Sequence, residues 1–505
     1  MDRLIPDISP PWRSMENRTR ILIYGNAIIL IAVVIYFFAL PTVILIQDIN
    51  DPGLRSGSMP RFAFRLHQSL SERIERWAVS RVSSGQAAKV NTYNVSGTEW
   101  PVFSSVFYLW STEALQEAWE KDPSLSRTMP AQYAQGAIQA VTALIADPNH
   151  ATWVKNYWGD DYLSHEDLFY RMLLISGLTS FQKLSGDKSY EPLLRMQTNS
   201  LASEIDASPY GLLDDYPGQC YPIDILPAIA AIRRADNILG TDHTAFAARA
   251  LRAFEGSRLD PQTELPAYIA DSRTGEGIGS ARGVGVSFML TWAPELWPET
   301  AQQWYERYDE QFWQRGWLAA GFREFPINYK GRTVLFDVDA GPIIAGYGTA
   351  ASAFGIGAAR VNGHFEQSYP MSAEALAASW PLPDGSLLLP RLLSNLSDAP
   401  YVGESALLFS LTRQPITSSG NNAGSLPFSV YLDLGIYAGL AIAGLGISTL
   451  RVMKWEKVDR YKPIFVSNER FRIWIILISL GTVAFIISWG IIGGLLILSA
   501  ELMPW

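Results

Sequence analysis

The sequence predicts an all-α protein: an (α/α)6 toroid ectodomain attached to one N-terminal and two C-terminal transmembrane helices. Between residues 91 and 415, apolar runs with helical spacing, about 9–20 residues each, alternate with loops rich in Gly, Pro and Asp. Strand-like alternation is limited to short pieces such as 333–338. Three long stretches without a charged residue lie near the two ends of the chain.

The uncharged stretches predict the membrane helices. Residues 21–47 and 473–500 exceed the roughly 20 apolar helical residues that a bilayer requires, and 434–450 suffices if its helix begins near 427. The first stretch is longer than a signal-peptide core and no small-residue cleavage site closes it, which favours an uncleaved anchor. The predicted spans are 21–46, 427–450 and 473–500.

Basic residues near the spans predict the orientation. Residues 1–20 contain four Arg, and the loop 451–472 contains seven Lys or Arg against three acids. Both segments therefore belong in the cytoplasm, so the linker and lead-in helix (47–90) and the toroid domain (91–415) lie on the periplasmic side of an inner (plasma) membrane. The exterior part is acidic, which excludes nucleic acid as the main partner. A single cysteine excludes a disulfide framework.

Helix count and pairing predict the toroid. The expected helices are 104–120, 130–147, 166–184, 190–207, 222–239, 242–256, 283–293, 298–316, 341–361, 372–380 and 404–412. With one undetected helix they make about twelve, and short connections join them in pairs. Gly186 and Gly240 fit the positions just after helix ends. Six hairpins over 320 or so residues suggest a ring of apolar inner helices, with loops at one end forming a pocket.

The acidic segment 211–224, GLLDDYPGQCYPID, is the strongest candidate for a site. Its prolines and glycines exclude a helix interior, and an apolar helix follows at once. It brings to a helix start the residues Asp214, Asp215, Tyr216, Tyr221 and Asp224. Paired carboxylates can divide acid and base duties. In the alternative, Asp224 only complements the helix dipole, and Asp214 and Asp215 only form turns.

A second candidate is Glu99, which follows a glycine turn and precedes a helix. Beside Trp100 its pKa could be raised, as a general acid requires, and the indole could stack on a sugar. The alternative is an exposed loop acid.

Further candidates lie at other loop ends. Asp337 and Asp339 precede an expected helix start at Gly-Pro. Either they act on a substrate, or they only cap that helix. Arg282 binds an anionic or hydroxylated substrate, or bonds loop carbonyls. Tyr170 follows three polar residues, His165, Glu166 and Asp167, whose acids are favoured as partners of a helix dipole.

Metal chemistry is not expected. The other four histidines are scattered without ligand spacing. Cys220 has no histidine near it in sequence, which favours a packing role over a nucleophile.

Three segments, read in order around the acidic loop, carry a family resemblance: FYRMLLISGLTSFQKLSGDKSYE, ILPAIAAIRRADNILGTDH and GPIIAGYGTAASAFGIGAARVNGH. Over about residues 95–415 the chain resembles the linalool dehydratase/isomerase-type (α/α)6 domain. The resemblance implies the same toroid, with an active site in its mouth and acid–base residues on the loop matching 211–224.

The chain departs from that family at the implied site. Asp214 or Asp215, and Asp224, stand where the family pattern has a Cys-Glu pair and a second Cys. Leu173 or a neighbour replaces the family's histidine, whereas Tyr170 is kept. A carboxylate-rich pocket on this scaffold is more similar to the inverting glycosidases that share the toroid.

The sequence therefore predicts a membrane-anchored extracytoplasmic hydrolase of glycosidic bonds in a surface polysaccharide or glycolipid, without metal or cofactor. Glu99 or Asp215 would be the general acid and Asp224 or Asp339 the base, with Asp214 beside them. The expected substrate contacts are Trp100, Tyr170, Tyr216, Tyr221, Arg282 and Asp337. Two alternatives remain open: a lyase or isomerase of a small lipophilic alcohol drawn from the bilayer, and a non-catalytic assembly or export partner.

Overall fold

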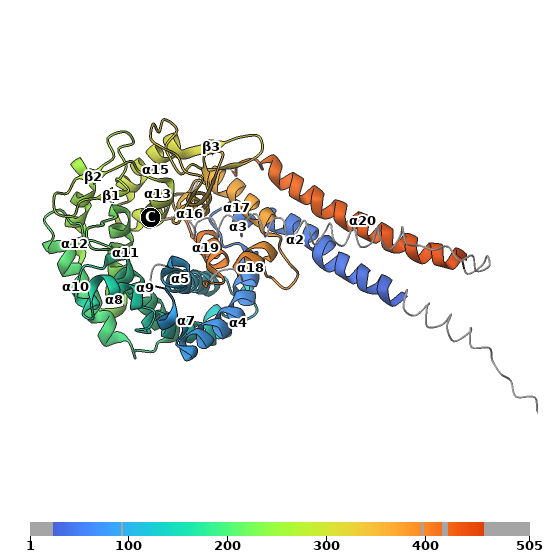
Figure 1. Ribbon diagram of the computed structural model, residues 1–505, viewed down its shortest axis with the longest axis horizontal. Helices are drawn as coiled ribbons and strands as arrows, with labels where there is room; N and C mark the ends of the chain where they lie inside the picture. The colour runs from blue at the N-terminus through green and yellow to red at the C-terminus, as the bar shows by residue number, and fades with distance from the viewer. Residues whose placement is uncertain (1–23, 92–93, 395–397, 417–422, 459–505) are drawn as a thin grey trace, which may run out of the picture.

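A ring of six helices forms the centre of the protein (Figure 1). The computed structural model describes residues 24–91, 94–394, 398–416 and 423–458. This part of the chain is mostly helical, which confirms the all-α prediction. The ring consists of α5 (Glu99–Lys121), α9 (Leu168–Ser185), α11 (Pro222–Leu239), α13 (Gly283–Leu290), α16 (Thr349–Val361) and α19 (Val402–Leu411). Each of these helices contacts the next, and α19 contacts α5.

Six further helices alternate with the ring helices along the chain. They are α4 (Arg61–Ser84), α7 (Gln135–Ala146), α10 (Glu191–Ala207), α12 (Thr244–Ala250), α15 (Pro298–Phe312) and α17 (Phe365–Ser379). Figure 1 shows α4, α7, α10 and α12 outside the inner ring. The shorter helices are α3 (Pro52–Arg55), α6 (Pro130–Tyr133), α8 (Thr152–Trp158), α14 (Ala293–Leu296) and α18 (Leu388–Ser394).

Local sequence explains where the ring helices begin and end. Pro222 is the first residue of α11, a position at which the missing N–H of proline costs nothing. Gly186 and Gly240 end α9 and α11 in the left-handed conformation, with φ of 71° and 66°, which confirms their expected place.

Helix α13 is apolar on every side because it is covered on every side. All eight residues of α13 are buried. Gly285 lies so close to the neighbouring α11 that a Cβ there would be 2.2 Å from Ile223 Cδ1. Gly355 in α16 is equally tight, since a Cβ would lie 2.4 Å from Phe322 Cδ2. Glycine at these two positions lets α13 approach α11 and lets α16 approach the Phe322 ring closely.

Helices α5, α9 and α11 run in the same direction. Near their first residues, Glu99, Asp167 and Asp224 belong to one network of interacting carboxyl groups. Near their last turns, Glu113 of α5 forms ion pairs with Lys183 of α9, at 2.6 Å, and Arg234 of α11, at 3.8 Å. The ring therefore has one end where helices begin and another where they finish.

Short strands occupy the loops: β1 (Ile269–Ala270), β2 (Gly277–Ile278), β3 (Trp313–Arg315), β4 (Ala320–Phe322), β5 (Phe336–Asp337), β6 (Gly341–Ile344) and β7 (Tyr347–Gly348). All pairs among them are antiparallel. The helix expected over 341–361 is wrong in its first part, since 341–348 forms β6 and β7. Gly341 and Gly346 have φ of 64° and 90°, conformations that a helix excludes.

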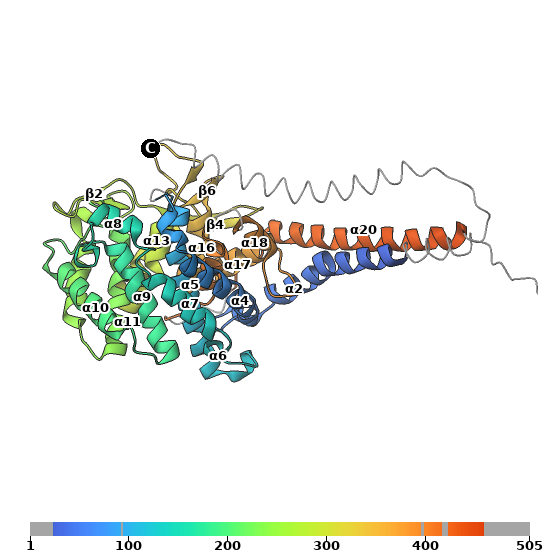
Figure 2. The same ribbon diagram turned by 60° about the horizontal axis from the view of Figure 1, so that its bottom comes forward.

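In the described part of the chain, two helices are long and apolar enough to cross a membrane, Tyr24–Ile49 and Phe428–Leu450. The first includes a π-helical stretch, Ile35–Ala39, followed by α2 (Leu40–Ile49). The second belongs to α20 (Phe428–Val458), which continues past the predicted end at 450. Both project from the same side of the ring (Figures 1 and 2). The predicted tail 1–20 and span 473–500 lie outside the described residues, as does most of the loop 451–472.

Candidate functional site

The acidic segment forms a tight turn that leads into α11. Asp215 N donates to Gln219 O at 2.9 Å and Gln219 N donates to Tyr216 O at 2.7 Å. Gly218 has φ of 78°, a conformation that favours glycine. The turn explains why the sequence has Pro and Gly between its acids and brings Asp215 and Asp224 to the same place.

Asp214 and Asp215 help to hold this turn. Gly218 N donates to Asp214 Oδ2 at 2.7 Å, and Tyr221 N donates to Asp215 Oδ2 at 3.0 Å. Both side chains are buried, and Oδ1 of each has no hydrogen-bond partner among the described residues. Burial, and then the charge of Asp224, raise the pKa of Asp215 well above its ordinary value. These surroundings therefore favour the protonated form of Asp215 more than water does.

Asp224 lies in the first turn of α11 and is half-buried. No hydrogen bond from the described residues reaches its carboxyl group. Burial, and then the charges of Asp339 and Glu99, raise the pKa of Asp224 to about 8. The positive end of the α11 dipole does not compensate for this repulsion. A carboxyl group in this state holds a proton at neutral pH and can donate it.

Glu99 is the first residue of α5, so it lies at a helix start rather than in a loop. The Tyr216 hydroxyl donates a hydrogen bond to Glu99 Oε1. Burial raises the pKa of Glu99 to about 7; the Tyr216 hydrogen bond opposes this shift and the Asp339 charge adds to it. The prediction that Glu99 has a raised pKa agrees with this environment.

Asp339 follows β5 and precedes β6, not a helix as expected. The Tyr268 hydroxyl donates to Asp339 Oδ2 at 2.6 Å. Solvent reaches the Asp339 side chain, yet burial is the main cause of its raised pKa, opposed by the Tyr268 hydrogen bond.

Arg282 is bound to protein carboxylates. Its Nε donates to Glu324 Oε1 at 2.7 Å, and its guanidinium pairs with Asp337 at 3.2 Å. The Arg282 guanidinium also lies 4.6 Å from the centre of the Tyr268 ring. These contacts favour a structural role over the predicted substrate contact. Asp337 is likewise engaged: burial raises its pKa, but Arg282 lowers it to below the ordinary value.

Aromatic side chains surround the acids. The Tyr221 and Tyr268 rings are 5.4 Å apart, and the Tyr216 ring lies 5.3 Å from Tyr157. Trp100 is half-buried in the first turn of α5, beside Glu99. The predicted substrate contacts Tyr216, Tyr221 and Trp100 therefore lie next to the carboxyl groups.

Tyr170 does not face the site. It is 2% exposed and lies between the rings of Trp153, at 6.0 Å, and Tyr162, at 5.8 Å. The prediction of a substrate contact there is corrected to a packing role, because the first turn of α9 turns this side chain into the core.

Three residues near the acids were not predicted to act. Asp167 precedes α9 in a left-handed conformation with φ of 31°, a strained geometry for a non-glycine residue. It is buried, Oδ2 has no partner in the described chain, and burial raises its pKa well above the ordinary value. The sequence did offer one signal for Asp167: it is an acid next to the start of an apolar helix, as Asp224 is. No local sequence pattern indicates that Tyr268 or the buried Glu324 lies near the acids. Burial raises the pKa of Glu324 to about 7, although Arg282 acts in the opposite direction.

Metal and thiol chemistry find no support here. Within the described ranges, no group of three or more His, Cys, Asp or Glu is arranged to hold a metal ion. Cys220 is fully buried, and burial raises the pKa of its thiol, a state typical of a packing residue.

Comparisons with known proteins add no assignment. The sequence matches no model of a known protein family, and no curated protein matches it.

Proposed function

We propose that the ring is an (α/α)6 toroid and that its carboxylate end is the active site of an acid–base enzyme that breaks a C–O bond. The closed contacts among six inner helices, and their strict alternation with six others, support the toroid. The main support for the activity is that Glu99, Asp224 and Asp339 come from three separate parts of the chain and interact with one another. Tyrosine hydroxyls donate hydrogen bonds to Glu99 and Asp339.

The first candidate reaction is hydrolysis of a glycosidic bond. Asp224 holds a proton, accepts no hydrogen bond from the described residues and is repelled by two other acids, so it is suited to protonate the leaving oxygen. Asp339 accepts the Tyr268 hydroxyl and experiences the charge of Arg282, which favour its ionised form.

In this reaction a water oxygen attacks the anomeric carbon while the bond to the leaving oxygen breaks. Asp224 gives its proton to the leaving oxygen, and Asp339 takes a proton from the water. Glu99 remains beside them, and its charge raises the proton affinity of Asp224.

The second candidate is dehydration of a lipophilic alcohol, as the family resemblance implies. A specific observation favours it: four exposed apolar side chains lie on the segment that holds Asp337 and Asp339, namely Val334, Leu335, Val338 and Ile344. Asp224 would then protonate the departing hydroxyl, and Asp339 would take a proton from the neighbouring carbon.

The apolar helices support a membrane location. We propose that Tyr24–Ile49, Phe428–Leu450 and residues 473–500 cross the inner membrane and hold the ring on its periplasmic side. The substrate would be a surface glycan, a glycolipid or a small lipophilic alcohol.

One experiment separates these reactions. The full-length protein in detergent is incubated in H2¹⁸O with a panel of bacterial surface glycans and, separately, of lipophilic tertiary alcohols. Hydrolysis releases a reducing end that carries ¹⁸O, whereas dehydration yields an alkene and releases the unlabelled hydroxyl. Absence of both products would contradict the proposal and favour a non-catalytic partner.

A further inference from the structure

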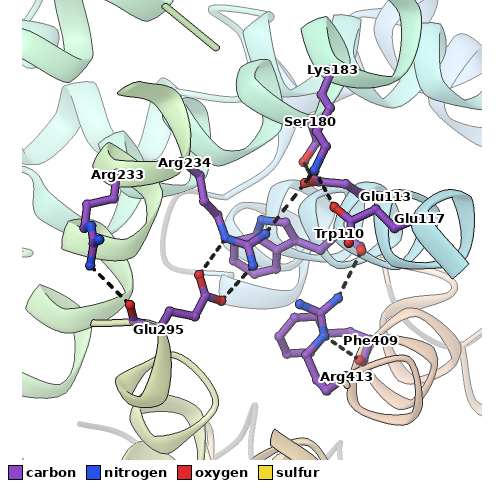
Figure 3. Close-up of polar contacts among 10 residues, drawn as sticks. All are labelled: Trp110, Glu113, Glu117, Ser180, Lys183, Arg233, Arg234, Glu295, Phe409 and Arg413. Carbon is purple, nitrogen blue, oxygen red and sulfur yellow. Dashed lines mark hydrogen bonds and ion pairs between the residues drawn. The ribbon is translucent and has the colours of Figure 1, made fainter. Parts of the chain in front are cut away.

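The opposite end of the ring holds a cavity of about 310 Å³. It lies at the last turns of α5, α9 and α11. Glu99 and Glu113 are fourteen residues apart on α5, so about 21 Å of helix separates this cavity from the carboxylate site. Six charged side chains contribute to its lining: Glu113, Glu117, Lys183, Arg234, Glu295 and Arg413 (Figure 3).

Every carboxylate in this group has a cationic partner. Lys183 Nζ lies 2.6 Å from Glu113 Oε1 and 2.5 Å from Glu117 Oε1. Arg234 binds Glu295 with two hydrogen bonds of 3.1 and 2.7 Å. The Ser180 hydroxyl also donates to Glu113 at 2.8 Å. Two cations thus hold the three acids in place (Figure 3).

Arg413 is the cation left over. Its Nε donates to Phe409 O at 3.3 Å and its Nη2 donates to Trp110 O at 3.0 Å. Among the described residues, no carboxylate lies within ion-pairing distance of Arg413 and no acceptor binds its Nη1. The side chain is 7% exposed, so water compensates for little of its charge. Burial, and then the charge of Arg234, lower the pKa of the Arg413 guanidinium to about 10, although the three glutamates of the cavity act on it in the opposite direction. The charged form therefore remains costly, and an anion bound directly to it in the cavity would relieve that cost.

Aromatic groups adjoin this guanidinium. The Trp110 and Trp292 rings are 4.6 Å apart, and Arg413 Cζ lies 5.9 Å from the centre of the Trp292 ring. Trp292 Nε1 is a buried donor with no hydrogen-bond partner in the described chain. Of these two rings, Trp110 lines the cavity, so the lining combines the Arg413 cation with one flat apolar surface.

We propose that this cavity is a second binding site, for a small monocarboxylate with a planar apolar body, whose carboxylate binds the Arg413 guanidinium. The three cations and three acids that line the cavity balance one another, and among the described residues Arg413 is the cation that no carboxylate contacts directly. A monoanion is the ligand that adds the least negative charge to this balance. A dianion such as phosphate would bring a second negative charge close to the three glutamates without a cation to receive it.

The test is calorimetric titration of the full-length protein in detergent with benzoate, its neutral amide benzamide and its cationic amidine benzamidine. We expect benzoate to bind, benzamide to bind at least about tenfold more weakly, and benzamidine not to bind. Equal binding of benzoate and benzamide, or no binding of benzoate, would overturn the proposal.

Variants locate the binding. R413Q is expected to weaken benzoate binding at least about tenfold, and R413K less, because lysine keeps the charge but not the planar fork. Asn237 is exposed at the rim of the cavity, so N237W blocks the entrance without changing the core, and it tests the site even if R413Q fails to fold. R249Q, an exposed arginine elsewhere, is the control. Unchanged benzoate binding in N237W would refute the location.

Discussion

The two ends of the ring treat acidic side chains in opposite ways. Where the helices begin, Glu99, Asp224 and Asp339 meet, and none of them pairs directly with a cation from the described part of the chain. Burial raises the pKa of each. Where the helices finish, Glu113 is equally enclosed, yet its pKa lies below the ordinary value: burial raises it, and Arg234 and Lys183 outweigh burial. Burial alone therefore does not decide the state of a carboxyl group. The balance between burial and nearby cations does, since two cations outweigh burial at Glu113 whereas Arg282 does not outweigh it at Glu324.

Acidic side chains serve two different purposes at the two ends of the ring. Paired acids contribute to stability and shape a cavity, whereas acids that repel one another retain protons and can transfer them. Helices α5 and α11 contribute to both environments, because Glu99 and Asp224 lie in their first turns while Glu113 and Arg234 lie further along them.

The largest expected effect is on catalysis at the end where the helices begin. Asp224→Asn removes the proposed acid without changing its size, and we expect activity to fall by about 10²–10⁴-fold. The measurement is initial rate on whichever substrate the ¹⁸O assay identifies. Glu310→Gln, which neutralises an exposed acid on the outer helix α15, serves as the control and should keep full activity. Equal rates for Asp224→Asn and the wild type would remove Asp224 from the mechanism.

Next in size is the loss of a paired acid at the other end. Glu113→Gln leaves Lys183 and Arg234 with one carboxylate fewer, and we expect a loss of about 2–3 kcal/mol in the free energy of unfolding at pH 7. Because the folded-state pKa of Glu113 is depressed, its stabilising effect exists above the unfolded pKa and disappears as the pH falls through the folded value. The deficit measured by denaturant titration should therefore shrink in acid.

Glu120→Gln is the matched control, since Glu120 is exposed on the same helix. It should change stability by less than about 0.5 kcal/mol. A deficit for Glu113→Gln no larger than that of Glu120→Gln would contradict the distinction between the two ends.

A smaller effect is expected from Tyr268→Phe. The Tyr268 hydrogen bond lowers the pKa of Asp339, so its removal raises that pKa. If Asp339 acts as the base in its ionised form, the acidic limb of the rate profile moves to higher pH and the rate at fixed pH falls by about 3–10-fold. The pH dependence of kcat/KM measures this shift. A fall in rate with an unmoved acidic limb would mean that Tyr268 acts only by positioning.

The smallest effect is on stability at the end where the helices begin. The pKa of Asp224 is raised in the folded protein to about 8, so the folded state binds more protons than the unfolded state between about pH 4 and pH 8. Stability contributed by this group therefore falls as the pH rises through that window. Asp224→Asn should raise the Tm by about 1–3 °C at pH 8 and by less at pH 5. A lower Tm for the variant at pH 8 would show that the Asp224 charge is compensated.

Local patterns account for much of the fold. The range 222–239 was predicted as a helix and matches α11 to the residue, because Pro222 and Gly240 mark its ends chemically. The start of α17 at Phe365 was missed by seven residues, since Pro370 inside the helix suggested a later start. The sequence analysis did not predict strands β6 and β7, because a run of apolar and small residues is compatible with a helix as well as with a short pair of strands.

Part of the candidate site was also predictable. Glu99, Asp215, Asp224 and Asp339 each lie where a loop meets a regular element, and all four belong to one group of interacting acids. The roles of Arg282 and Tyr170 were not predictable. Arg282 meets Glu324, forty-two residues away, and Tyr170 meets Trp153 in the core.

The sequence alone determined the helical class, the apolar stretches and the collection of acids on one turn. The reason is that apolar spacing, prolines and glycines affect the conformation of the chain only within a few residues. Only the tertiary structure decided which acids are paired and which are not. Glu113 finds its cations about seventy and 120 residues along the chain, while Asp224 finds only other acids. The physical reason is that a pKa depends on charges and water within a few ångströms in space, and the ring sets those neighbours.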